Sequence, residues 1–145
     1  MLPLGPEIEK RIEQLFAPED REEVRGLLVN ECGENIPMWK SAGLERLRRK
    51  SIALTGWLQR LVEARLSGLV DIITPSEAQA RGCQLSLRIA RPADVARRCH
   101  DELTAAGIVG DWREPDVLRL APTPLYNSFG DVLAAVDALS QAVRR

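Results

Sequence analysis

The stretch that decides the fold is CQLSLRI, residues 83–89, in which apolar and polar residues alternate strictly. An extended chain would carry the two kinds on opposite faces: Cys83, Leu85, Leu87 and Ile89 against Gln84, Ser86 and Arg88. Because successive side chains of a strand point to opposite sides, the pattern predicts a strand with one buried face and one wet face. Such a strand needs neighbouring strands and a second layer of elements to cover its apolar face.

Helical and extended patterns flank this strand on both sides. Before it, leucines at helical spacing predict a helix over residues 42–66, and a short strand is expected over 70–74. After it we expect a helix over 93–106, a short strand beginning at 108–109, a strand over 117–121 and a last helix capped by Asn127 or Ser128. The order α-β-β-α-β-β-α predicts an α+β fold, with a small sheet of three to four mostly antiparallel strands covered by helices.

The first 37 residues have a pattern of their own. Pro6 and Pro18 each stand at the start of an apolar helical repeat beside acidic residues, and Gly33 is placed to end the second repeat. We therefore expect two domains, a helical hairpin over residues 1–37 and an α+β domain over residues 38–145.

Composition and charge exclude several classes of function. The chain has 145 residues, 45% of them apolar and 28% charged, and a formal net charge of −1. This balance gives no electrostatic case for nucleic acid or for an anionic membrane surface as partner. No apolar run reaches the length of about 20 residues that crosses a bilayer, and the acidic N-terminus is unlike a signal peptide. Cys32, Cys83 and Cys99 lack CxxC spacing, which argues against disulfides and zinc, so we expect a cytoplasmic protein with reduced thiols.

Most signatures of catalytic chemistry are missing from the sequence. Neither GxGxxG nor GxxxxGKS/T, the glycine-rich phosphate-binding patterns, occurs. The single histidine, His100, has no nucleophile placed beside it, so we expect it to be a surface or helix-packing residue. The acids on the same predicted helix, Asp94, Asp101 and Glu102, are expected to be solvated charges. We predict no catalytic residue and no metal ligand.

Arg119 is the remaining candidate for a functional residue. It interrupts the short apolar strand VLRLA, residues 117–121, and its side chain should point away from Leu118 and Leu120. An arginine held by a strand at the rim of a sheet is suited to bidentate capture of a carboxylate, because its planar fork matches two oxygens. The alternative is an ordinary arginine on the wet face of the sheet, as expected for Arg88, and periodicity alone favours this alternative.

Two stretches resemble the C-terminal region of kynureninase, a pyridoxal-phosphate-dependent hydrolase of tryptophan catabolism. They are GCQLSLRI, residues 82–89, and GIVGDWREPDVLRLAPTPLYNSFGDV, residues 107–132. The stretches LERLRRKSIALTGWLQRLVEARL and DIITP also fit the family's entry into its small domain. The resemblance covers about residues 40–145, roughly the last quarter of a full-length enzyme.

This resemblance implies the fold of the aspartate aminotransferase superfamily, usually a homodimer. In the family a large domain holds the cofactor, and the small C-terminal domain supplies an arginine that grips the substrate α-carboxylate. That arginine stands in a strand just before A-P-x-P-L-Y-N, which is the position of Arg119. The family hydrolyses kynurenine to anthranilate and alanine, in the kynurenine pathway that leads toward NAD biosynthesis. The resemblance thus favours a substrate-binding role for Arg119.

The chain departs from the family in lacking a match to the large domain. Schiff-base chemistry needs a desolvated lysine beside the cofactor, and none of Lys10, Lys40 and Lys50 follows a strand-to-loop pattern suited to it. We therefore expect a truncated relative that binds no pyridoxal phosphate and is inactive alone. A kynurenine-type amino acid is expected to bind only if a separate large-domain chain completes the cleft. The alternative is a non-catalytic interaction or dimerisation module.

Overall fold

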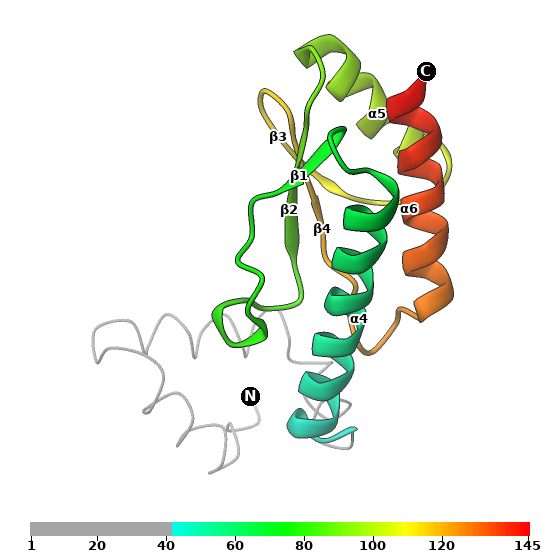
Figure 1. Cartoon of the computed structure of the whole chain (residues 1–145). Helices are drawn as coiled ribbons and strands as arrows, with labels where there is room; N and C mark the ends of the chain where they lie inside the picture. Colours follow the sequence, from blue (N-terminus) through cyan, green and yellow to red (C-terminus); the bar gives the residue numbers. More distant parts are fainter. Residues whose placement is uncertain (1–41) are drawn as a thin grey trace, which may run out of the picture. The chain divides into compact units, whose positions relative to one another are not determined.

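The part of the chain that the structure describes is built in two layers, a sheet and three helices on one of its faces (Figure 1). The computed structural model describes residues 42–145. Helices and strands follow the predicted order α-β-β-α-β-β-α, with a short 3-10 helix, η1 (Ala78–Ala80), between the first two strands. The prediction of an α+β fold is confirmed.

The sheet has four strands, and every neighbouring pair is antiparallel. The strands are β1 (Val70–Ile72), β2 (Leu85–Ile89), β3 (Asp111–Arg113) and β4 (Val117–Leu120), and their order across the sheet is β1-β2-β4-β3. Thus β2 and β4 are interior strands, while β1 and β3 form the edges. Three antiparallel pairings build the sheet, and the turn between β3 and β4 carries the acidic residues Glu114 and Asp116.

Several predicted strand ends were wrong. The strand predicted over residues 83–89 begins at Leu85, so Cys83 precedes it and is half-buried. The strand expected at 108–109 begins later, at Asp111. In the second case the apolar pattern extends beyond the ladder of backbone hydrogen bonds, because Ile108 packs against the core from the loop before β3.

The helices are α4 (Leu44–Arg65), α5 (Ala93–Ala105) and α6 (Phe129–Arg144). Each buries one stripe of small and aliphatic side chains against the sheet, as amphipathic helices do. Two polar residues, Ser51 and Thr55, are also buried in α4, and the Thr55 hydroxyl donates to the Ser51 carbonyl oxygen at 2.9 Å. The Thr55 hydroxyl can be buried because its hydrogen-bond acceptor lies within the same helix.

Ser128 is the residue that caps α6, which decides between the two predicted candidates. The Ser128 hydroxyl accepts from the Asp131 backbone nitrogen, and the Asp131 carboxylate accepts from the Ser128 backbone nitrogen. This reciprocal pair satisfies two groups that a helix start otherwise leaves without partners. Asn127 instead closes the preceding turn, because its side-chain oxygen accepts from the Thr123 backbone nitrogen at 2.8 Å.

The core lies between the sheet and the helices. The inward residues of β2 are fully buried (Leu85, Leu87 and Ile89), and Leu118 of β4 joins them. They pack in one cluster with apolar residues of all three helices, listed by helix as Leu54, Leu58 and Val62, then Ala96, Cys99 and Leu103, then Val136 and Leu139. Each fully buried leucine or isoleucine stabilises the fold by about 1.5–3 kcal/mol relative to an exposed one. This core fixes the backbone of β2 and β4 and therefore the position of their outward side chains.

Residues Glu45–Arg145 form one compact unit. The predicted helical hairpin over residues 1–37 and the predicted boundary after residue 37 lie outside the described residues, so both stay predictions. In the described part of the chain, no helix combines the length and the apolar character needed to cross a membrane.

Candidate functional site

The face of the sheet that points away from the helices is polar. Strand register places its residues in two rows across the sheet: Ser86, Arg119 and Asp111 in one, and Asp71, Arg88, Val117 and Arg113 in the other. This follows directly from the alternation of the strands, whose other residues fill the core. We call these seven residues the open face.

Arg119 lies in the middle of the open face, with Ser86 on one side and Asp111 on the other. Its side chain points away from Leu118 and Leu120, as predicted, and is 31% exposed. The expectation that it stands at the rim of the sheet was wrong, because β4 is an interior strand. The strand that carries Arg119 is therefore held by neighbouring strands on both sides, which fixes the base of the side chain more firmly than an edge strand would.

Asp111 is the ion-pair partner of Arg119. The Arg119 Nη2 atom lies 2.6 Å from the Asp111 Oδ2 atom. Among the residues that the structure describes, the buried Arg119 Nε atom has no hydrogen-bond partner. A guanidinium carries five N–H groups, so a single contact to Asp111 leaves much of its hydrogen-bonding capacity unused. The second partner of Asp111 is Arg113, whose Nε lies 3.2 Å from the same Oδ2 atom.

The remaining charges of the open face are exposed and weakly paired. Arg88 lies 3.9 Å from Asp116, and its side chain is 53% exposed. It is thus the wet-face arginine that the sequence predicts. Exposed pairs of this kind contribute from nothing to about 1 kcal/mol. Arg119 differs from Arg88 in its greater burial, its central place and its short contact to a carboxylate.

The cavities of the described residues lie elsewhere. One, of about 610 Å³, is lined mostly by apolar residues of α6, of the loop before β3 and of the loop after β4, among them Val109, Pro122 and Val132. A second, of about 540 Å³, lies between α4 and the loop that contains Ala78 and Arg81. Arg119 lines neither. A ligand held by Arg119 would therefore rest on the open face, and residues 42–145 would not enclose it.

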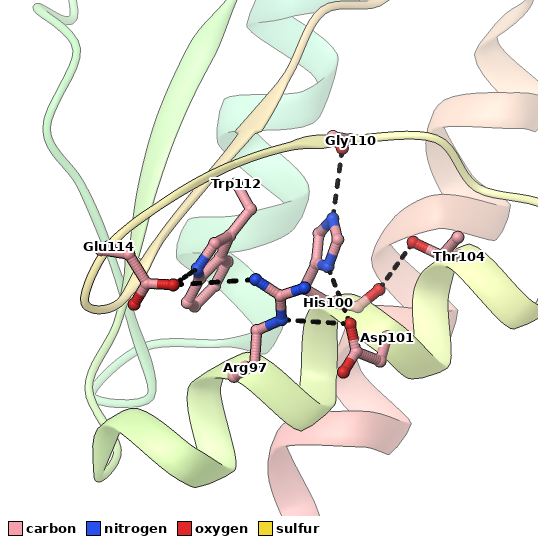
Figure 2. Close-up of polar contacts among 7 residues, drawn as sticks. All are labelled: Arg97, His100, Asp101, Thr104, Gly110, Trp112 and Glu114. Atoms are coloured by element: carbon pink, nitrogen blue, oxygen red, sulfur yellow. Dashed lines mark hydrogen bonds and ion pairs between the residues drawn. The ribbon is translucent and has the colours of Figure 1, made fainter.

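His100 belongs to a polar cluster on the helix side of the β3 edge (Figure 2). Its Nδ1 atom lies 3.1 Å from the Asp101 carboxylate and its Nε2 atom 3.3 Å from the Gly110 carbonyl oxygen. Its ring packs against the Trp112 ring, with 5.6 Å between centroids. The histidine is thus a helix-packing residue, as the sequence predicts. It anchors the strand that carries Asp111.

Arg97 and Glu114 complete this cluster. The Arg97 guanidinium lies over the Trp112 ring, 5.7 Å from its centroid, and its Nε donates to Asp101 at 3.2 Å. The Trp112 indole N–H donates to Glu114 at 3.0 Å, on the turn between β3 and β4. The hydrogen bond from His100 is the largest cause of a lowered pKa of Asp101, with the Arg97 charge adding to it. Asp101 is therefore an exposed, solvated charge, as the sequence predicts, that also pairs with His100 and Arg97.

The other candidate groups for chemistry are inert in this fold. Burial raises the pKa of the Cys99 thiol, so the reactive thiolate is disfavoured there. Within residues 42–145, no group of three or more histidine, cysteine or acidic side chains is arranged to hold a metal ion. Lys50 is the one lysine of this region, and it is exposed on α4. A Schiff-base lysine needs a desolvated site, so the described residues do not fit pyridoxal phosphate by themselves.

Asp111 is the site residue that the sequence analysis missed, although a signal for it was present. The sequence Arg113-Glu114-Pro115-Asp116 is typical of a turn, and an antiparallel hairpin around that turn pairs residue 113 with 117 and residue 111 with 119. Counting outward from the turn would have placed Asp111 opposite Arg119.

Comparison with known proteins points to one family. Residues 47–139 match the family model described as the kynureninase C-terminal domain. The kynureninase of Stenotrophomonas maltophilia (strain K279a) is 55% identical over 98 residues, which make up 68% of this chain and 23% of that protein. The kynureninases of Xanthomonas oryzae pv. oryzae (strain PXO99A) and Xanthomonas euvesicatoria pv. vesicatoria (strain 85-10) are 49% and 48% identical, over 68% and 71% of this chain. The chain spans about a quarter of the length of these curated relatives.

Proposed function

The chain belongs to the kynureninase family, and on that premise we propose that it is a substrate-gripping small domain whose Arg119 binds the α-carboxylate of a kynurenine-type amino acid. In this proposal the domain takes part in the hydrolysis of kynurenine to anthranilate and alanine only when a cofactor-binding domain faces it. That domain would come from a second polypeptide or from sequence beyond these 145 residues. We place the reaction in the cytoplasm, in keeping with the unpaired thiols of Cys83 and Cys99.

The observation that carries the proposal is the position of Arg119. It stands at the centre of the sheet face that the described helices leave uncovered, and among the described residues its guanidinium pairs with Asp111 through Nη2 alone. A planar guanidinium on a fixed backbone suits the two oxygens of a carboxylate. The same position lies within the stretch that matches the kynureninase C-terminal domain.

We further propose that this chain alone does not turn over kynurenine. Pyridoxal phosphate supplies the family's electron sink, and the described residues provide no buried lysine to hold it. Purified chain mixed with pyridoxal phosphate alone should develop no Schiff-base absorbance, and after addition of kynurenine it should release no anthranilate above a protein-free control. A lysine-dependent absorbance band together with anthranilate release would refute this part.

Binding by Arg119 can be tested on the full chain by nuclear magnetic resonance. Kynurenine should shift the Arg119 side-chain Nε–H signal and nearby amide signals weakly, because half of the cleft is missing. Kynuramine, which is kynurenine without its carboxylate, should not shift them. The Arg119→Ala variant should lose the response, and the matched variant Arg88→Ala on the same face should keep it. Equal responses to kynurenine and kynuramine would contradict carboxylate recognition.

A second candidate function is a dimerisation or interaction module derived from the small domain. Val109 and Tyr126, an apolar and an aromatic side chain that a partner would cover, are exposed by 89% and 67%. A homodimer, as expected for the family, would cover such residues. Light scattering coupled to size-exclusion chromatography tests this: a dimer that Val109→Asp dissociates favours the module, and a monomer across the micromolar range counts against it.

A further inference from the structure

Asp111 pairs with Arg119 on the open face, and the stability of the fold does not explain this ion pair. The two residues are directly opposite in the β3–β4 hairpin, and the pair faces away from the core. With 46% of the Asp111 side chain exposed, the carboxylate could be hydrated without a partner. An exposed ion pair adds little to stability, from nothing to about 1 kcal/mol. The pair is thus better explained by what it does to Arg119.

The backbone that carries Asp111 is held from the opposite face. Trp112, the next residue, packs its ring against His100 of α5, and its indole N–H donates to Glu114 at 3.0 Å (Figure 2). The preceding residue, Gly110, receives the contact from His100 Nε2 at 3.3 Å. A three-residue edge strand is thereby anchored on both sides of Asp111, so that its carboxylate stays in place.

The contact holds one end of the arginine fork. The Asp111 Oδ2 atom lies 2.6 Å from Nη2, a distance typical of a strong charge-assisted hydrogen bond. Arginine otherwise rotates about four side-chain bonds, and ordering such a side chain on binding costs free energy. A guanidinium that is already oriented by Asp111 would bind a carboxylate with less of this cost.

We propose that Asp111 is a positioning residue, which orients the Arg119 guanidinium at the open face for an incoming amino-acid carboxylate. This inference rests on the proposed carboxylate-binding role of Arg119. It assigns Asp111 no contact with the substrate. Arg113, which contacts the same Asp111 oxygen at 3.2 Å from the exposed edge strand, serves as the matched control.

The experiment uses the full chain and its Asp111→Ala, Asp111→Asn and Arg113→Ala variants, with amide spectra confirming that each is folded. The first readout is the Arg119 Nε–H signal without ligand. Its relaxation should show an ordered side chain in the parent chain and in Arg113→Ala, and a mobile one in Asp111→Ala. Asp111→Asn keeps an acceptor oxygen without the charge, so it should retain part of the order.

The second readout is the dissociation constant for kynurenine. Asp111→Ala should raise it by roughly two- to tenfold, the effect of ordering one long side chain. Asp137→Ala makes the same change of charge at an exposed aspartate of α6 and should leave the dissociation constant unchanged. Unchanged order and affinity in Asp111→Ala would overturn the inference while carboxylate binding by Arg119 stands. Tighter binding in Asp111→Ala would also overturn it, because Asp111 would then be a competitor of the ligand. If the parent chain does not respond to kynurenine, the proposed function is wrong, and so is this role of Asp111. The first readout would still show whether Asp111 orders the Arg119 side chain.

Discussion

His100 and Gly110 join α5 to the segment that leads into β3, because the imidazole Nε2 lies 3.3 Å from the Gly110 carbonyl oxygen. The other ring nitrogen faces the Asp101 carboxylate at 3.1 Å. The His100 side chain is 15% exposed, so the imidazole ring is largely shielded from water, whereas Asp101 is 58% exposed. His100 therefore has a structural role. Its contact with Gly110 helps to hold the neighbouring Asp111 on the open face.

Replacing His100 by alanine should destabilise the domain and loosen β3. The variant leaves the Gly110 carbonyl without its partner and removes the ring beneath Trp112, so we expect a loss of roughly 1–3 kcal/mol in the free energy of unfolding. Urea unfolding followed by circular dichroism measures it. Thr104→Ala is the control, since Thr104 is exposed on the same helix and should change stability by less than about 0.5 kcal/mol. Equal stabilities for the two variants would contradict the role given to His100.

Asp101 should make stability depend on acid pH. Its pKa in the folded chain is lowered, first by the hydrogen bond from His100 and also by the Arg97 charge. Between the pKa of Asp101 in the folded chain and its pKa in the unfolded chain, the unfolded chain binds more protons. The contribution of Asp101 to the free energy of unfolding is therefore fully present above the ordinary aspartate pKa of about 3.9. This contribution is lost as the pH falls through the pKa of the folded chain. Urea midpoints measured from pH 6 downward (roughly to pH 2) should fall less steeply for Asp101→Asn. A slope identical to that of the parent chain would exclude this linkage.

Gly110 should not tolerate even alanine. A Cβ atom there would lie 2.7 Å from Leu118 Cδ1 and 3.1 Å from Leu120 Cδ2, with the Arg119 carbonyl oxygen 3.3 Å away. Overpacking of this kind costs about 1–3 kcal/mol, and here it would push β3 away from β4. Thermal unfolding tests it against Gly82→Ala, where a Cβ atom would meet nothing within 4 Å. A harmless Gly110→Ala would mean that the loop before β3 packs less closely than described.

Removing the cap of α6 should weaken the C-terminal helix. Ser128→Ala deletes the acceptor for the Asp131 backbone nitrogen, and N-cap losses of this type cost about 1 kcal/mol. Ser128→Asp keeps an acceptor and should retain most of the stability, whereas Asn127→Ala should disturb the preceding turn and spare the cap. Thermal melts of the three variants separate these effects. The cap assignment would be wrong if Asn127→Ala reproduced the loss of Ser128→Ala at the helix.

Much of the fold follows from the sequence because the apolar periods are strong. The alternation around Leu85 and Leu87 and the leucine repeat of α4 each permit one orientation against a core, so element order and fold class could be predicted. Strand ends could not, because a residue such as Ile108 packs against the core without joining the hydrogen-bonded ladder. Periodicity reports burial, and burial extends past the ends of a strand.

The candidate site was predicted less completely, for a different physical reason. The outward direction of Arg119 is local information, fixed by the alternation with Leu118 and Leu120. Its interior place and its pairing with Asp111 depend on which strands become neighbours, and β2 joins β4 from a distance of some thirty residues along the chain. The cluster around His100 also requires α5 to pack against the β3 edge, which no single stretch of sequence encodes.

The interior place of β4 has a consequence for how anything could approach Arg119. A residue between two hydrogen-bonded neighbours cannot advance toward a ligand unless the whole sheet travels with it. Any closing of a cleft over Arg119 must therefore be a rigid-body movement of whole domains. The guanidinium keeps its place on the sheet during such a movement. Differences in ligand size would then have to be accommodated by the surface that meets this domain.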